Sequence, residues 1–281
     1  MDAKKIAVIT LMKNHSDLTM KLINSIIEKD DYPKDKLTIY VADTGSDDEE
    51  KKIMYDFIDN VSMDVVYIEY DYYNFAKINN DVVANEIDDD TDLILLINND
   101  VELINNAISR AVKTFESEDN IGTVGAMLLY PDGKVQHGGI FLMYDKNGTP
   151  QLTHCLLNKE YNKELMNGEY YTLGNTGAFM LTSLKNWKEV GGLNVAYQHC
   201  FEDVEFNVDL LKRGYKNITN YDAMAFHKES ATRHQETCPG DIQKVRKALK
   251  HPKIAKINES LYRRRINYPQ HFIKIVQKKR K

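Results

Sequence analysis

The sequence places a polar triplet directly after its most apolar stretch. Leu93 to Ile97 reads Leu-Ile-Leu-Leu-Ile and ends at Asn98-Asn99-Asp100. Three polar side chains at the end of a buried strand cost free energy unless they form a site. A hard cation such as Mg²⁺ or Mn²⁺ prefers carboxylates, substrate phosphate oxygens and water as ligands. Asp100 is therefore a candidate metal ligand that would bridge the cation to a diphosphate, and an ordinary strand-ending turn is the alternative.

Two further polar segments follow apolar runs near the N-terminus. Asn14 lies just after the first run, and Asp43 lies after the second, before a glycine-containing turn. Amide and hydroxyl groups after the first run suit hydrogen bonding to a base or ribose, and the Asp43 carboxylate could accept a bond from an imide N–H or a ribose hydroxyl. The alternative for Asp43 is an Asx-turn or a helix cap. Lys77 could lie near a phosphate or a sugar, or belong to an ordinary helix start.

Acidic and imidazole groups occur in the second half of the chain. Glu202 and Asp203 are adjacent at the expected start of a helix, where the helix dipole favours ionised carboxylates. Their presence could be no more than this stabilisation, but an ionised Asp203 could also act as a general base on an acceptor hydroxyl. His227 ends an apolar run and could complete the coordination of a metal. A structural histidine is the alternative.

These residues fall at the ends of alternating strands and helices. The apolar runs lack the alternation of a half-exposed strand, which is typical of a parallel sheet covered by helices on both faces. Ligands bind such sheets at the carboxyl ends of the strands, where the polar segments of the first half lie. Strands are expected at Ile6 to Met12, Leu37 to Ala42, Val65 to Glu69 and Leu93 to Ile97.

After Ile121 the alternation gives way to strands separated by long loops. Strands are expected at Val124 to Tyr130, Gly138 to Met143, Gly177 to Thr182 and Ile218 to Phe226, with a helix over Phe206 to Arg213. We therefore expect one mixed α/β domain over residues 1–233 and a helical basic tail over residues 234–281.

The net charge of −5 is unevenly distributed. From Asp241 to Lys281 there are fourteen Lys and Arg against two acids, a net charge of +12, so the remainder carries −17. An acidic body argues against general nucleic-acid binding, and we expect no nucleic-acid partner. A basic tail suits an anionic membrane surface or a phosphate-bearing acceptor, which predicts peripheral contact with the inner face of a membrane. The alternative is a solvated helical tail packed on the acidic body.

Several classes of protein lose support. A chain of 281 residues with 42% apolar composition can bury a full core, which excludes disorder as its main state. No apolar run approaches the roughly 18 residues of a membrane-spanning helix, and no signal peptide is apparent. The three cysteines form no CxxC pair, so a reducing cytosol fits and a cytoplasmic protein is expected. Neither GxGxxG nor a P-loop follows the first strand, which disfavours dinucleotide oxidoreductases and P-loop NTPases.

Taken in order, these segments resemble the family 2 glycosyltransferases with the GT-A fold, particularly the rhamnosyltransferase-like and O-antigen branch. The resemblance runs from about Ile6 to Arg233. Each motif alone is weak, but the ordered set is specific. The set comprises Ala42 to Asp47, Tyr73 to Asn80, Leu96 to Glu102, Val124 to Gly139, Thr176 to Leu181, Val190 to Leu193, Glu202 to Phe206 and Phe226 to Ser230.

The resemblance implies a role for each candidate residue. Residues 1–120 would form the nucleotide-binding half and residues 121–233 the acceptor-binding half. Asn98-Asn99-Asp100 stands where the family has its DXD motif, but amides replace carboxylates at Asn98 and Asn99, so the metal affinity is expected to be modest. Nucleotide contacts would come from Thr10, Asn14, Asp43, Lys77 and Asn99; donor or acceptor contacts from Asn98, Thr176, Gly177 and Glu202; metal ligation from Asp100 and His227; and base catalysis from Asp203.

The function implied is inverting transfer of a sugar from a UDP- or dTDP-linked donor to a hydroxyl of a glycan or lipid-linked acceptor, with Mn²⁺ or Mg²⁺ as cofactor. Polysaccharide biosynthesis would be the setting. One alternative is a nucleotide-sugar-binding protein without transfer activity. A nucleotidyltransferase is another, but it would require a glycine-rich, basic phosphate-binding loop where this sequence has Leu11-Met12-Lys13-Asn14.

Overall fold

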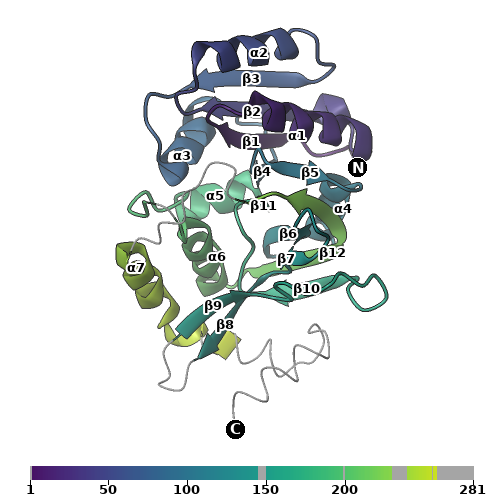
Figure 1. Cartoon of the computed structure of the whole chain (residues 1–281). Helices are drawn as coiled ribbons and strands as arrows, with labels where there is room; N and C mark the ends of the chain where they lie inside the picture. The colour runs from purple at the N-terminus through teal and green to yellow at the C-terminus, as the bar shows by residue number, and fades with distance from the viewer. Residues whose placement is uncertain (1, 145–149, 199, 230–238, 255, 258–281) are drawn as a thin grey trace.

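A computed structural model of the chain describes residues 2–144, 150–198, 200–229, 239–254 and 256–257 (Figure 1). One large mixed sheet runs through the molecule in the order β10-β12-β6-β11-β4-β1-β2-β3, with β5 beside β12 and β7 beside β6. Its strands are β1 (Ile6–Met12), β2 (Leu37–Asp43), β3 (Asp64–Glu69), β4 (Leu93–Ile97), β5 (Val101–Leu103), β6 (Ile121–Leu129), β7 (Val135–His137), β10 (Glu169–Thr172), β11 (Phe179–Ser183) and β12 (Lys216–His227). A separate two-stranded sheet pairs β8 (Ile140–Tyr144) with β9 (Pro150–His154).

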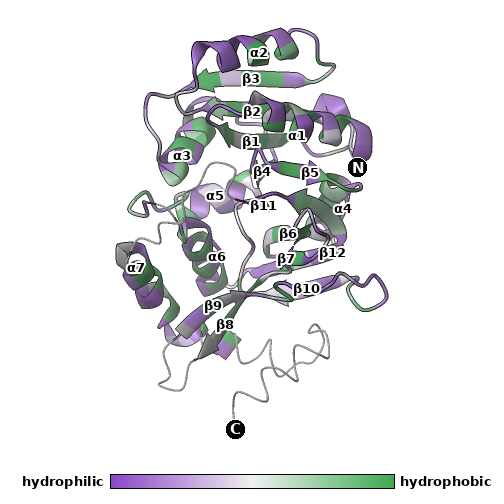
Figure 2. Ribbon diagram, viewed as in Figure 1, coloured by the Kyte–Doolittle hydropathy of each residue, from purple (hydrophilic) through white to green (hydrophobic). Residues whose placement is uncertain are grey.

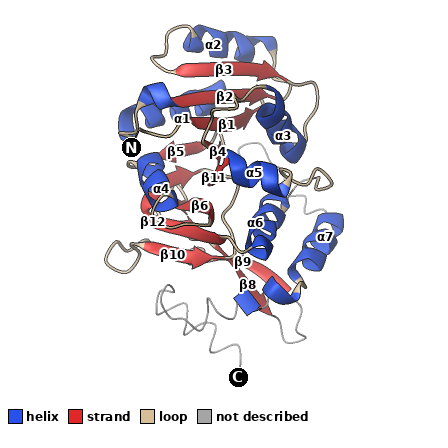
Figure 3. Ribbon diagram, turned by 180° about the vertical axis from the view of Figure 1, so that it is seen from behind, coloured by secondary structure: helices blue, strands red, loops and turns tan. Residues whose placement is uncertain are grey.

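Helices cover both faces of the large sheet, as Figures 1 and 3 show. One apolar cluster joins the sheet to α1, α2 and α4, and a second joins its other face to α3, α5 and α6. The helices are α1 (Ser16–Lys29), α2 (Asp48–Ile58), α3 (Phe75–Asn85), α4 (Ala107–Phe115), α5 (Leu184–Val190), α6 (Glu202–Arg213) and α7 (Pro239–Leu249), with a 3-10 turn at Lys34–Lys36. Because both faces are covered, strands such as β4 are buried at every position.

The sheet changes direction where the sequence pattern changes. Strands β4, β1, β2 and β3 run parallel, whereas β11 is antiparallel to both β4 and β6. The prediction of a mixed α/β sheet is therefore confirmed. The expected bounds of the first and fourth strands agree with β1 and β4. The strands β5, β7, β9 and β10 were not anticipated from the sequence.

Helices α2 and α6 differ in how many of their residues are buried. Only Met54 of its eleven residues is buried, and the helix is mostly purple, hence hydrophilic, in Figure 2. By contrast, α6 buries seven of its twelve residues between the sheet and α7. Helix α6 is therefore held on two sides, which suits an element that begins with Glu202 and Asp203.

The beginning of the basic tail packs on the body. Val245, Leu249 and Ile254 are buried in one apolar cluster with residues of α6 and β8. Asp241 is fully buried and accepts a hydrogen bond from the backbone N–H of Gln198 at 3.0 Å. For α7 the alternative of a helix packed on the body is the one observed; residues 234–238, 255 and 258–281 of the predicted tail lie outside the described residues. Within the described part of the chain, no helix combines the length and the apolar character needed to cross a membrane.

Candidate active site

Asp100 and His227 meet at the carboxyl end of β4. The turn after β4 leads into β5, and antiparallel pairing sets His227 opposite Val101. This register brings Nε2 of His227 to 3.2 Å from Oδ1 of Asp100. The amide Nδ2 of Asn98 also lies 3.2 Å from the same Nε2. Residues 129 positions apart in the sequence thus form one cluster because β12 returns beside β5.

Asn99 points elsewhere. Its Nδ2 donates to Oγ1 of Thr19 on α1 at 3.3 Å, and its side chain is buried. The backbone turns here, with the N–H of Val101 donating to the carbonyl of Asn98 at 3.2 Å, and the side chains of Asn98 and Asp100 converge on His227 while that of Asn99 does not. The structure therefore brings together three of the predicted residues, Asn98, Asp100 and His227, and separates Asn99 from them.

Asp203 is held by backbone donors at the start of α6. Its Oδ2 accepts from the N–H of Gly177 at 2.9 Å, and its Oδ1 accepts from the N–H of Val204 at 2.7 Å. Together the two bonds fix the direction of the carboxylate. The residue after Gly177 links this acid to the metal-binding candidates, because the carbonyl of Ala178 accepts from the N–H of Asn98 at 3.2 Å. Gly177 and Ala178 therefore join Asp203 to the cluster at Asp100.

A buried amide pair supports this link. Asn207, one turn after Asp203 on α6, donates from Nδ2 to the carbonyl of Asp203 at 2.7 Å and to that of Asn175 at 3.0 Å. Its Oδ1 accepts from Oγ1 of Thr123 at 2.6 Å and from the N–H of Asn175 at 3.2 Å. These bonds tie the first turn of α6 to the segment that contains Thr176 and Gly177. Neither Asn175 nor Asn207 was singled out from the sequence.

Two histidine rings, those of His137 and His154, contact each other in the second half of the chain. The rings of His137 and His154 pack edge to face with centroids 4.7 Å apart. Burial lowers the pKa of His154, and the negative charges of Asp203 and Glu229 act on the same ring in the opposite direction. Burial lowers the pKa of His137 far more strongly, with a smaller effect from His154 and His227. Burial therefore favours the neutral form of both rings.

The predicted nucleotide residues Asn14 and Asp43, which follow β1 and end β2, are joined by hydrogen bonds through Ser46. Oδ1 of the fully buried Asp43 accepts from the backbone of Gly45 and Ser46 and from Oγ of Ser46, and its Oδ2 accepts from the hydroxyl of Tyr67. Asn14 donates its backbone N–H to Oγ of Ser46 at 2.6 Å. Asp43 thus has the contacts of the Asx-turn alternative, and its Oδ2 could accept a second hydrogen bond beside the one from Tyr67.

The remaining predicted residues come from β1, α3, α6 and the segment before β11. Thr10 is fully buried, and its Oγ1 has no hydrogen-bond partner among the described residues. Lys77, in the first turn of α3, holds its ammonium 4.1 Å from the ring centroid of Tyr72. Glu202 is buried next to Asp203, and Oγ1 of Thr176 accepts from the N–H of Ala178 at 3.4 Å.

The donor set at Asp100 and His227 fits a divalent cation shared with a phosphate ligand. Adjacent ligands of a six-coordinate cation with bonds of about 2.1 Å lie about 3 Å apart, close to the 3.2 Å between the carboxylate oxygen and the imidazole nitrogen. The described residues contain no group of three or more His, Cys, Asp or Glu side chains that could enclose a metal. Two protein ligands would leave most positions to diphosphate oxygens and water.

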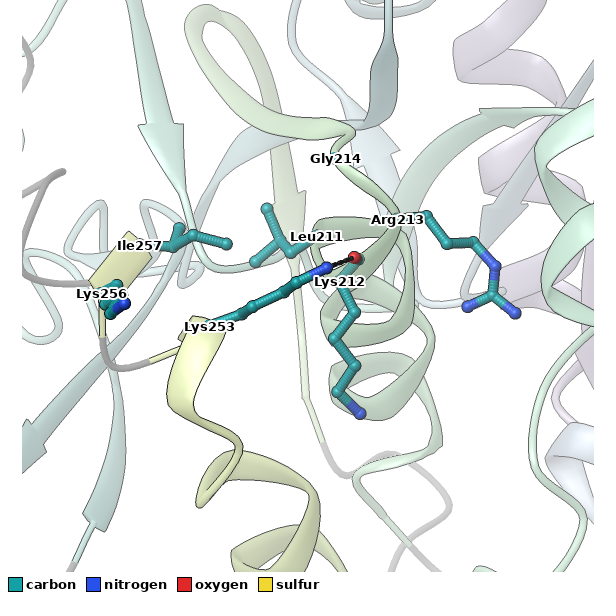
Figure 4. Close-up of a pocket in the computed structure, with 7 residues that line it drawn as sticks. All are labelled: Leu211, Lys212, Arg213, Gly214, Lys253, Lys256 and Ile257. Atoms are coloured by element: carbon teal, nitrogen blue, oxygen red, sulfur yellow. Dashed lines mark hydrogen bonds between the residues drawn. The ribbon is translucent and has the colours of Figure 1, made fainter.

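An open hollow of about 320 Å³ lies at the far end of α6, away from Asp203 (Figure 4). Lys253 reaches across it and donates from Nζ to the carbonyl of Lys212 at 3.0 Å. Since a helix rises about 1.5 Å per residue, Lys212 lies about 13 Å along the axis from Asp203. The hollow is thus separate from the candidate active site. Its lining comprises Leu211, Lys212, Arg213, Gly214, Lys253, Lys256 and Ile257.

Comparisons with known proteins place the fold among the GT-A glycosyltransferases. The mannosyltransferase PcManGT from Pyrobaculum calidifontis, solved with GDP-Man and Mn²⁺, has a TM-score of 0.61 and 14% identity over 93% of this chain and 75% of its own. GalNAc-T7, solved with UDP, GalNAc and Mn²⁺, has a TM-score of 0.65 and 12% identity over 80% of this chain and 44% of its own.

The sequence comparison points the same way. The O-antigen biosynthesis protein RfbC of Myxococcus xanthus is 23% identical over 239 residues, which cover 84% of this chain and 18% of that protein. The chain thus spans less than a fifth of the length of that relative. No family model matches the chain. The predicted GT-A fold and the resemblance to glycosyltransferase family 2-like proteins are confirmed.

Proposed function

We propose that the protein transfers a sugar from a nucleoside-diphosphate donor to an acceptor hydroxyl, with inversion at the anomeric carbon. The observation on which the proposal depends is the link from Asp203 through Gly177 and Ala178 to Asn98, at the head of the cluster that contains Asp100 and His227. A directed carboxylate and a set of metal ligands at one edge of a GT-A sheet are the two parts that such a transfer needs.

Asp203 is the proposed general base. The N–H groups of Gly177 and Val204 fix the direction of its carboxylate, so it can accept the proton of an acceptor hydroxyl as that oxygen attacks the sugar. Asp100 and His227 are the proposed ligands of Mn²⁺ or Mg²⁺. Such a cation would offset the charge that develops on the departing diphosphate. The two structural neighbours solved with Mn²⁺ and a nucleotide support this assignment of the metal.

The proposed donor is a nucleotide sugar. One neighbour was solved with GDP-Man and the other with UDP, so the shared fold does not select a base. We retain UDP- or dTDP-linked sugars as the expected donors and a glycan or lipid-linked acceptor, in line with the O-antigen relative. Thr10, Asn14, Asp43 and Lys77 are the proposed nucleotide contacts, and Thr176 and Glu202 the proposed contacts to the donor sugar and acceptor.

A panel of nucleotide sugars tests the proposal in two steps. Thermal denaturation with each donor, with and without Mn²⁺, should identify a donor that raises the melting temperature only with the metal, because ligands that bind the folded state stabilise it. Release of the nucleoside diphosphate with an acceptor glycan then measures turnover, and NMR of the product gives the anomeric configuration. Binding without turnover would favour the alternative of a binding protein, and retention of configuration would exclude the proposed inversion.

The membrane contact predicted for the tail is tested separately. Because α7 contributes Val245 and Leu249 to the core, removing it would expose apolar surface, so the chain should be shortened after Ile257 instead. We expect the full chain to sediment with vesicles of anionic lipid at low salt and the shortened chain to remain in solution. Equal sedimentation of both chains would remove the tail from this role.

A further inference from the structure

Gln136 occupies an irregular position beside His227. Strand β7 pairs with β6 so that His137 lies opposite Leu128 and Val135 lies opposite Leu129, which leaves Gln136 as the extra residue of a β-bulge. A bulge turns a side chain out of the regular alternation of the strand. Here the turned side chain is buried, with 4% of its surface exposed, and contacts the imidazole of His227.

Three contacts fix the orientation of the Gln136 amide. Its Nε2 lies 3.3 Å from the backbone carbonyl of His227 and 3.2 Å from Oε2 of Glu229. A carbonyl and an ionised carboxylate can only accept hydrogen bonds, so the NH₂ group must be on this side. The carbonyl oxygen Oε1 is therefore on the other side, 2.5 Å from Nδ1 of His227.

This orientation determines which imidazole nitrogen has the proton. Since Oε1 can only accept, Nδ1 of His227 must donate, and Nε2 then has a free lone pair. Nδ2 of Asn98 lies 3.2 Å from Nε2 and can donate to this lone pair, whereas Oδ1 of Asp100, at the same distance, offers a second lone pair, as two ligands of one cation would. The opposite tautomer would place an N–H where a cation would bind and a lone pair against the oxygen of Gln136.

We propose that Gln136 is a positioning residue that fixes His227 as the Nδ1-protonated tautomer and so presents Nε2 to the site at Asp100. Glu229 holds the Gln136 amide in the orientation that this requires. Glu229 has an unusual backbone for a residue other than glycine, with φ of 48°, and its carboxylate also interacts with Tyr130, whose pKa is raised to about 12 by burial and by that bond. The proposed benefit to a metal rests on the proposed function, whereas the tautomer does not.

The tautomer can be measured without metal or substrate. In metal-free protein with ¹⁵N-labelled histidine rings at pH 8, the nitrogen shifts of His227 distinguish the two neutral forms, and His227→Asn identifies its signals. We expect the wild type to be in the Nδ1-protonated form. Gln136→Met, similar in length but without donor or acceptor, should lose this form in part or in full. Glu229→Gln should lose part of the Nδ1-protonated form, because the new NH₂ group can donate to the Gln136 amide and so allows this amide to rotate by 180°.

Gln151→Met provides a matched control, because Gln151 lies in β9 and its side chain is not among those hydrogen-bonded to His227. It should leave the His227 signals unchanged. Circular dichroism and melting temperature show whether each variant is folded. An unchanged Nδ1-protonated signal in folded Gln136→Met would overturn the proposal, as would a wild type in the opposite tautomer.

Mn²⁺ binding in the presence of UDP, followed by electron paramagnetic resonance, separates the two hypotheses. Loss of an outer partner of a metal-bound histidine typically costs about 10- to 100-fold in metal affinity, and we expect that range for Gln136→Met. If the wild type binds no Mn²⁺ while the tautomer still depends on Gln136, the metal part of the proposed function fails and the positioning role stands. If the wild type binds Mn²⁺ and Gln136→Met binds it equally well in the same tautomer, the positioning role fails alone.

Discussion

Gly177 donates its backbone N–H to Oδ2 of Asp203 at 2.9 Å. Its neighbour Ala178 accepts from the N–H of Asn98, so one dipeptide spans the distance between the proposed base and the proposed metal ligands. Strand β11 begins directly after this dipeptide, at Phe179 opposite Ile97, so the pairing of β11 with β4 fixes the position of the dipeptide beside the end of β4. The sheet, rather than a flexible loop, therefore sets the distance between the two parts of the site.

Replacing Asp203 by Asn should abolish most of the transfer. The amide has nearly the same shape but cannot take a proton, and loss of a general base typically lowers turnover by about 10²- to 10⁴-fold. Donor affinity in thermal denaturation should change little. Asp209→Asn, on the same helix and paired with Lys212, is the control that should retain full turnover. Transfer by Asp203→Asn at near wild-type rate would remove Asp203 from the base role.

Asn98→Asp should strengthen Mn²⁺ binding. The amide of Asn98 lies 3.2 Å from Nε2 of His227, so a carboxylate there would add a charged oxygen ligand beside Asp100. Asn99→Asp adds the same charge on the opposite side, near Thr19, and should bind Mn²⁺ as the wild type does. Titration with Mn²⁺ in the presence of UDP measures both affinities. Equal gains from the two variants would show that general charge, and not the cluster at Asp100, sets the affinity.

Asn207→Ala should destabilise the fold and lower transfer together. The buried amide of Asn207 makes four hydrogen bonds to nitrogen and oxygen atoms, and its loss removes a partner from both the carbonyl and the N–H of Asn175. Unsatisfied buried groups cost about 1 to 3 kcal/mol each, so urea unfolding should show a loss of at least about 2 kcal/mol. Asn167→Ala, whose amide is exposed, should leave both properties unchanged. A stable variant with normal turnover would mean that Asp203 is positioned without Asn207.

Much of the fold could be predicted because long apolar runs encode buried strands directly. β1 and β4 are such runs, and their bounds were predicted correctly. The short strands β5 and β7 have three residues each and form only because a partner strand is already in place. Their pairing with β12 and β6 is a tertiary effect that no local pattern encodes.

The sequence indicated which residues belong to the candidate site but not which of them contact one another. Asp100 and His227 were chosen as strand-ending ligands, and the pairing of β5 with β12 brings them together. Gln136 was part of a recognised motif but received no role, since its direction depends on a bulge. The hydrogen bond from Tyr67 to Asp43 forms because β3 lies beside β2, so it could not be inferred from either segment alone.

Asp241→Ala should weaken the packing of α7 on the body. Asp241 is fully buried, accepts from the N–H of Gln198 and pairs with Lys244 at 3.3 Å. Loss of this buried, hydrogen-bonded carboxylate should lower the free energy of unfolding in urea by about 1 to 3 kcal/mol. The exposed Asp132→Ala is the control. Limited proteolysis should cut the loop before α6 faster in Asp241→Ala, and an unchanged rate would contradict a role for α7 in holding that loop.

Stability should fall as the pH drops below about 6.5. Burial lowers the pKa of His137 well below 6.5, so the folded state keeps this ring neutral while the unfolded state takes up a proton. The unfolded state then binds more protons, and the free energy of unfolding decreases as the pH falls from 6.5 toward the folded pKa. His154, whose pKa burial also lowers, adds to this slope, although its hydrogen bond to the carbonyl of Gln136 and the charges of Asp203 and Glu229 reduce its share. Urea unfolding at pH 7.5, 6.5 and 5.5 with a chelator measures the slope in the wild type and in His137→Gln, which should be less sensitive to pH; an identical slope in both would show that other groups cause the acid destabilisation.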